Sequence, residues 1–271
     1  MLLSGCTTTT DHHYVFPAGL EDAVDIEVAV TKRLGMRALL TRGSMNRSQR
    51  DGGLPPDSVV QDEDTILADS ERVVGRHHQR GEDAMVQIAL APCSPFSVTP
   101  ELMRATAELA ERLDVRLHTH LAEDPDEDTY AARTFGKRTV EHFEDVGWCT
   151  DRSWVAHCIY PNPAEVSRLG RAGVGVAHCP SSNMLIGGGG SDAASYKNAA
   201  SGVTARLVRS SIGTTSRARA WVAPSTTSGA NPASWASSQR DAQRHHRSPG
   251  LSPANPHSVR GVERSLPTLF E

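Results

Sequence analysis

Arg116-Leu-His-Thr-His-Leu-Ala-Glu123 is a short apolar segment that ends in two histidines and a carboxylate. His118 and His120 are two residues apart, so on a β-strand their side chains point to the same face of the sheet. Glu123 follows where this strand is expected to pass into a loop. Imidazoles beside a carboxylate at the end of a buried strand suit a divalent metal ion with a proton carrier next to it. The alternative is a structural histidine pair that binds no metal.

Six apolar segments alternate with helical segments along the first 186 residues. The predicted strands cover residues 2–10, 36–41, 85–91, 115–121, 154–159 and 173–179. Periodicity and capping residues predict helices over residues 19–34, 62–79, 100–113, 127–147 and 163–172. This alternation is typical of an α/β fold with a parallel sheet and crossover helices. Polar residues at several strand ends favour a (β/α)-barrel, and no glycine-rich dinucleotide-binding loop follows a strand.

Length and composition narrow the class of protein. A chain of 271 residues with 38% hydrophobic residues is long enough for one large barrel or two small domains. No apolar run reaches the length of a membrane span, and Met1–Cys6 lacks the basic and apolar regions of a signal peptide. The five scattered cysteines show no CxxC spacing. They predict reduced thiols in a cytoplasmic protein.

The charge distribution divides the chain into two regions. Residues 187–271 carry nine arginines and Lys197 against four acidic residues, a net charge of +6, which leaves −10 for residues 1–186. The second region is rich in serine, alanine and proline and has no helical or strand period. We therefore expect a low-complexity, disordered or irregular basic tail over residues 187–271. Its arginines are scattered without an aromatic platform, so nucleic-acid binding is not expected.

Six blocks of sequence carry a resemblance to a known family. The blocks lie at predicted strand ends, in residues 4–14, 41–45, 52–56, 117–123, 155–158 and 178–184. In this order they resemble the amidohydrolase superfamily, in the branch of 8-oxoguanine deaminase, guanine deaminase and hydroxyatrazine hydrolases. The resemblance covers residues 1–186 and implies strands 2–7 of a (β/α)8 TIM barrel.

The resemblance implies a metal-dependent hydrolase of a C–N bond on a nitrogen heterocycle, such as an 8-oxoguanine-like purine. It implies one divalent ion, Zn2+ or alternatively Fe2+, with His120 as a ligand. His157 matches the residue that contacts the metal or holds the attacking water. Glu123 matches the acid/base carboxylate that moves a proton from water to a ring nitrogen. His118 becomes a structural neighbour.

Further residues are candidates for binding the small-molecule substrate. Arg42 could contact a carbonyl oxygen of a planar ring, with an ion pair at the barrel mouth as the alternative. Tyr14 could form a wall of the pocket or simply pack, and Asn183 could line the site or support a turn. His12 and His13 could line the site or remain solvated.

Two parts of the family pattern are not found in this sequence. The resemblance implies a metal-binding HxH pair on strand 1 and an aspartate after strand 8, and neither is recognisable here. We therefore predict a poorly active chain, whose tail arises from a frameshift or whose gene is a degraded paralogue. The alternatives are a triazine chlorohydrolase or aminohydrolase and a non-catalytic fragment. The sequence leaves open whether the chain forms a homo-oligomer.

Overall fold

The structure, a computed structural model, describes residues 2–81, 83–191, 195 and 207–209. The chain divides into two compact units, Met1–Trp221 and Val222–Glu271, and every described residue belongs to the first. Within this described part, no helix combines the length and apolar character needed to cross a membrane.

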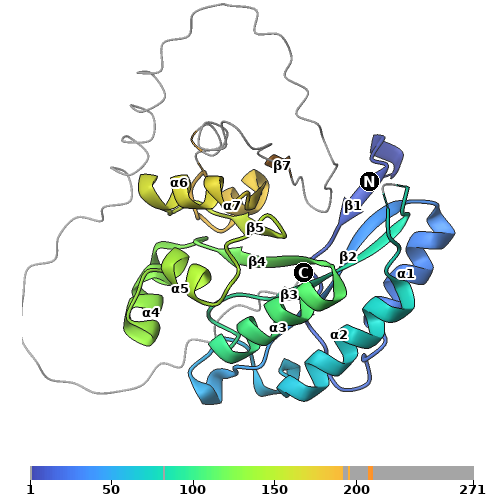
Figure 1. Cartoon of the computed structure of the whole chain (residues 1–271), viewed down its shortest axis with the longest axis horizontal. Helices are drawn as coiled ribbons and strands as arrows, with labels where there is room; N and C mark the ends of the chain where they lie inside the picture. Colours follow the sequence, from blue (N-terminus) through green and yellow to red (C-terminus); the bar gives the residue numbers. More distant parts are fainter. Residues whose placement is uncertain (1, 82, 192–194, 196–206, 210–271) are drawn as a thin grey trace, which may run out of the picture. The chain divides into compact units, whose positions relative to one another are not determined.

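The first unit is built on one parallel sheet of seven strands (Figure 1). The strands are β1 (Thr8–Thr10), β2 (Arg37–Ser44), β3 (Val86–Pro92), β4 (Arg116–Leu121), β5 (Ser153–His157), β6 (Gly175–His178) and β7 (Leu207–Arg209). Each strand pairs with the next along the chain. A doubly wound sheet reverses its strand order at a switch point, and these strands do not. The predicted partial (β/α)-barrel is therefore confirmed.

Strand β7 lies in the region predicted to be a tail. It pairs parallel to β6, with Val176 opposite Leu207 and His178 opposite Arg209. This strand was not predicted, because three residues are too few to show a strand period. The prediction of disorder for most of residues 187–271 falls outside the described residues.

Helices connect the strands. They are α1 (Ala23–Leu34), α2 (Glu63–His77), α3 (Pro100–Leu113), α4 (Pro125–Phe135), α5 (Thr139–Asp145), α6 (Pro163–Arg171) and α7 (Pro180–Leu185). Single 3-10 turns occupy Leu2–Ser4, Gln49–Asp51 and Asp57–Val59. Helices α1, α2 and α3 lie side by side, and α2 and α3 pack on β3 (Figure 1).

The helical region predicted over residues 127–147 consists of two helices, α4 and α5. Helix α4 ends at Gly136, which has φ +72° and donates its N–H to the carbonyl of Ala132. Glycine takes this left-handed conformation at low cost and ends a helix. Thr99 caps the start of α3, since its hydroxyl accepts from the N–H of Leu102 at 3.2 Å.

The two faces of the sheet bury different residues. Leu40, Ile88 and Leu117 belong to the large core beneath the helices. Ala89, Trp154 and Ala177 form a smaller cluster on the opposite face. Because side chains alternate along a strand, this pattern decides which polar groups reach the inside of the barrel.

Candidate active site

Four histidines from three strand ends gather on the inner face of the barrel. The ring of His120 stacks on that of His12, with 4.4 Å between the centroids, and on that of His157 at 5.3 Å. His118 lies 4.4 Å from His12 and stacks on Trp154. His118 also donates from Nδ1 to the carbonyl of Trp154 at 2.9 Å, so it is held by its neighbouring strand.

The two predicted metal ligands are held through the same ring nitrogen. His120 donates from Nδ1 to the carbonyl of Cys93 at 2.7 Å, and His157 donates from Nδ1 to Oδ1 of Asn183 at 2.7 Å. A proton on Nδ1 leaves the Nε2 lone pair free in a neutral imidazole. Burial, and next the charge of His157, lower the pKa of His120 to about 4. Both the tautomer and the neutral state of His120 therefore suit a metal ligand.

Glu123 completes a contact pair with His157. Its Oε1 lies 3.2 Å from Nε2 of His157, and its side chain is 28% exposed whereas that of His157 is 6% exposed. Burial raises the pKa of Glu123 above the ordinary value, while nearby His157 lowers it. A carboxyl group with a raised pKa at a partly open site suits proton transfer.

The backbone around this pair is strained. Ala122, His157 and Cys158 have φ values of +49°, +67° and +49°, a left-handed region that residues with a Cβ rarely adopt. The N–H of Cys158 donates to the carbonyl of Leu121 at 3.0 Å, and the N–H of Ile159 to that of Ala122 at 2.8 Å. The ends of β4 and β5 are thus joined where they carry Glu123 and His157. Strain of this kind concentrates at functional sites.

Tyr14 and Asn183 lie beside these histidines. The ring of Tyr14 approaches His12 and His120 edge-on, at 5.0 and 5.8 Å. Burial, and next the neighbouring Cys93, raise its pKa to about 12, so the phenol stays neutral. Asn183 is completely buried and its Oδ1 is already bonded to His157. The structure therefore places Asn183 behind His157, where it can orient the ring.

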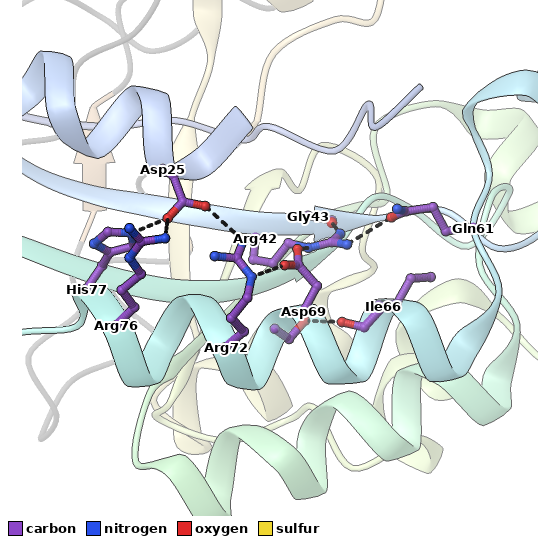
Figure 2. Close-up of polar contacts among 10 residues, drawn as sticks. Asp25, Arg42, Gly43, Gln61, Ile66, Asp69, Arg72, Arg76 and His77 are labelled. Carbon is purple, nitrogen blue, oxygen red and sulfur yellow. Dashed lines mark hydrogen bonds and ion pairs between the residues drawn. The ribbon is translucent and has the colours of Figure 1, made fainter. Parts of the chain in front are cut away.

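Arg42 lies on the other face of β2, apart from these residues. It is 1% exposed, and its Nε lies 2.6 Å from Oδ2 of Asp69 on α2. Its remaining nitrogens donate to Oε1 of Gln61 and the carbonyl of Gly43 (Figure 2). The guanidinium also covers the ring of Phe16 at 3.9 Å. Arg42 and Leu40 are two residues apart on β2, so their side chains point to the same face of the sheet. We therefore do not include Arg42 in the proposed site.

Two features of the site were not assigned from the sequence. His12 was expected to be a solvated loop residue or to line the site, and it packs against both His118 and His120. Glu127 went unnoticed, although its carboxylate binds the N–H groups of Ala122 and Glu123. The signal available was its position four residues after Glu123, in the first turn of the next helix. Among the described residues, no group of three or more histidine, cysteine, aspartate or glutamate side chains is arranged to hold a metal ion.

The sequence and the fold of the chain are similar to those of known proteins. The chain is 61% identical over 189 residues to an 8-oxoguanine deaminase of Pseudomonas aeruginosa, which covers 70% of the chain and 42% of that protein. It is 36% identical over 188 residues to a hydroxydechloroatrazine ethylaminohydrolase of Pseudomonas sp. (strain ADP), covering 69% and 39%. Its fold is similar to the solved structure of an atrazine chlorohydrolase from Arthrobacter aurescens TC1 complexed with zinc. The TM-score is 0.72 at 32% identity, covering 76% of this chain and 45% of that one.

The chain thus spans about two fifths of the length of the curated relatives that it matches. The model of the amidohydrolase family matches residues 1–252, well over half of the sequence. The matched region includes the whole described sheet and all of the site residues. The chain therefore belongs to the amidohydrolase family.

Proposed function

We propose that this chain carries the acid/base part of a hydrolytic deaminase site that acts on a nitrogen heterocycle of the 8-oxoguanine class. The observation that carries the proposal is the 3.2 Å contact between Oε1 of Glu123 and Nε2 of His157, with His120 stacked beside it. The 61% identity to an 8-oxoguanine deaminase supports the choice of substrate class.

In the proposed site, His120 and His157 would hold a divalent metal ion. Their Nδ1 atoms are engaged by a carbonyl and an amide oxygen, which is the arrangement that orients histidine ligands in metalloproteins. A related structure was solved with zinc, which favours Zn2+ over the alternative, Fe2+. When bound, the ion supplies the Lewis acidity that makes hydroxide available near neutral pH.

Glu123 has the central role among the residues of this chain. Its carboxylate would move one proton from the attacking water to a ring nitrogen, and then the remaining hydroxyl proton of the adduct to the amino group, which leaves as ammonia when the C–N bond breaks. Tyr14, with its neutral phenol, would cover one side of the heterocycle. Asn183 would act through His157 rather than on the substrate.

A second candidate is the hydrolysis of a triazine substituent. It is favoured by 36% identity to a hydroxydechloroatrazine ethylaminohydrolase and by the fold shared with an atrazine chlorohydrolase. Both reactions use water at an electrophilic ring carbon and differ in the leaving group. Release of ammonia from 8-oxoguanine, measured beside release of chloride or alkylamine from triazines, separates them.

We also propose a cytoplasmic location. The five cysteines are scattered along the sequence without CxxC spacing, and Cys93 and Cys158 are buried. Free thiols are the usual state in reducing compartments. Labelling of the unfolded chain with a thiol reagent, directly after extraction from cells, should modify five cysteines per molecule; fewer would contradict the proposal.

Zinc titration of the purified chain tests the proposed metal site. We expect calorimetry to show that the wild-type chain binds zinc and that His120→Ala and His157→Ala each bind it more weakly. Equal zinc affinity in wild type, His120→Ala and His157→Ala would contradict the site.

The same samples test the prediction that the chain is poorly active. Stoichiometric zinc together with rapid ammonia release from 8-oxoguanine, lost in Glu123→Gln, would overturn it.

A further inference from the structure

Glu127 is a buried carboxylate that serves the loop between β4 and α4. It lies in the first turn of α4 and is 1% exposed. Its Oε1 accepts from the N–H of Ala122 at 2.8 Å, and its Oε2 from the N–H of Glu123 at 3.0 Å. Both oxygens are therefore used on two successive peptide groups that come before the helix.

Helix α6 shows what a glutamate at this helical position ordinarily does. Both helices begin with a proline and place a glutamate at the third helical residue. In α6, Glu165 accepts from the N–H of the N-cap residue Asn162 at 2.6 Å, which forms a capping box. In α4 the N-cap is Asp124, but Glu127 accepts instead from the N–H groups of the two residues before the N-cap, Ala122 and Glu123.

The segment held by Glu127 leads directly into the proposed acid/base residue. Ala122 is left-handed, and its carbonyl accepts from the N–H groups of Ile159 and Tyr160 at 2.8 and 3.2 Å. The peptide group between Ala122 and Glu123 is thus held through its carbonyl by the loop after β5 and through its N–H by Glu127. The side chain of Glu123 begins at the Cα next to this peptide group and contacts His157.

We propose that Glu127 is a positioning residue, which fixes the peptide groups of Ala122 and Glu123 and so keeps the Glu123 carboxylate beside the ring of His157. The inference rests on the proposed function, because it assigns Glu127 to the proton-transfer step. Glu127 touches neither substrate nor metal in this role. It removes alternative conformations of the strained turn, which is how supporting residues keep a catalytic group in place.

Glu127→Gln tests the proposal, with Glu165→Gln as the matched control. Glutamine keeps one oxygen that can accept from Ala122 or Glu123, but its NH2 group faces the N–H of the other residue and cannot accept from it. Loss of a hydrogen bond to a carboxyl group should speed amide exchange at Ala122 or Glu123 roughly tenfold. In Glu165→Gln the exchange of these two amides should match wild type. If Glu127→Gln does not fold, Glu127→Asp keeps the carboxyl group but is one methylene too short to reach both amides.

Ammonia release from 8-oxoguanine in the presence of zinc provides the second measurement. In Glu127→Gln we expect kcat to fall roughly ten- to hundredfold, the usual effect of removing a partner behind the reacting groups. KM should stay within about twofold, because the substrate contacts are unchanged. In Glu165→Gln both constants should stay within about twofold of wild type, even though its loss of the Arg138 ion pair lowers thermal stability.

Unchanged exchange of both amides in Glu127→Gln would overturn the proposal. So would faster exchange with an unchanged kcat, since the turn would then not control proton transfer. A wild-type chain that releases no ammonia would instead contradict the proposed function. In that case amide exchange and a crystal structure of Glu127→Gln decide the inference, which fails if Glu123 still contacts His157.

Discussion

Asn183 and His157 show how one residue can act through another. Asn183 is completely buried and accepts the Nδ1 proton of His157 at 2.7 Å. Asn183→Leu keeps the size of the side chain but removes the acceptor, so we expect zinc affinity to fall roughly ten- to hundredfold. Asn183→Asp retains an acceptor oxygen and should bind zinc at least as tightly as wild type. Calorimetric titration of the two variants checks this, and equal affinities would contradict it.

A second residue-scale prediction concerns Asp11 and the pH dependence of stability. Its Oδ1 accepts from the N–H of Thr41 at 2.8 Å, while its Oδ2 and Oε2 of Glu27 are buried without a hydrogen-bond partner among the described residues. Burial, and next the charge of Glu27, raise the pKa of Asp11 well above 3.8. The folded chain therefore keeps a proton that the unfolded chain releases, and stability falls as pH rises from about 4 through the raised pKa.

Asp11→Asn keeps the acceptor for Thr41 and removes the titrating proton. We expect the free energy of unfolding of this variant to decline less than that of wild type between pH 4 and neutral pH. Urea unfolding at a series of pH values measures both curves. Parallel curves would show that Asp11 titrates equally in the folded and unfolded states.

Single residues of the site were predictable where a strand set their direction. The segment 117–123 indicated His120 and Glu123 as partners, and strand β4 brings both to His157. Arg42 was harder to place, because neighbouring residues of β2 point to opposite faces of the sheet. Arg42 points to the same face as Leu40, beneath the helices. The burial of His12 depends on packing between segments that are far apart in sequence, which local patterns do not encode.

At the scale of elements, the end of β2 lies against the loop that carries Tyr14. Gly43 donates its N–H to the carbonyl of His13 at 2.8 Å. A Cβ on Gly43 would lie 2.2 Å from that carbonyl oxygen and 2.7 Å from Cα of Tyr14. Because backbone atoms cannot move aside cheaply, Gly43→Ala should destabilise the fold by about 1–3 kcal/mol or more.

Gly75 provides the control for this prediction. It lies inside α2, where an added Cβ meets open space. Gly75→Ala should therefore stabilise the chain by roughly 0.5–1 kcal/mol, since alanine favours helix. Urea unfolding of both variants gives the two free-energy changes. A similar change in both would contradict the close approach at Gly43.

The strands and most helices were predictable as elements, but their ends were less so. Apolar runs bounded by polar residues locate β2 to β6 within a few residues. The break between α4 and α5 was missed because apolar periodicity continues across Gly136. Tertiary contacts settle it: Arg138, just before α5, pairs with buried Glu165 on α6 at 2.6 Å. Such contacts override a local helical preference.

At the scale of the whole molecule, we propose that the barrel region folds without the end of the chain. The compact unit that contains the barrel strands extends to Trp221. A chain cut after Trp221 should unfold within about 1 °C of the full chain. A cut after Ile186 removes β7 from its pairing with β6 and should lower Tm by several degrees, since each kcal/mol is worth about 2–4 °C.

Calorimetric scans of the two shortened chains and the full chain make this comparison. Equal Tm values for both cuts would show that β7 contributes nothing to stability. A large loss in the chain cut after Trp221 would contradict the proposed division into a barrel and a separate tail.

The left-handed backbone at Ala122 has a consequence for selection on thermal stability. An alanine in this conformation costs about 1–2 kcal/mol, which a glycine avoids. Screening variants for heat resistance alone should therefore recover Ala122→Gly. That exchange would also let the following carboxylate sample more orientations, so turnover should decline among the survivors. At position 122, selection for thermal stability therefore favours glycine, whereas selection for turnover favours alanine.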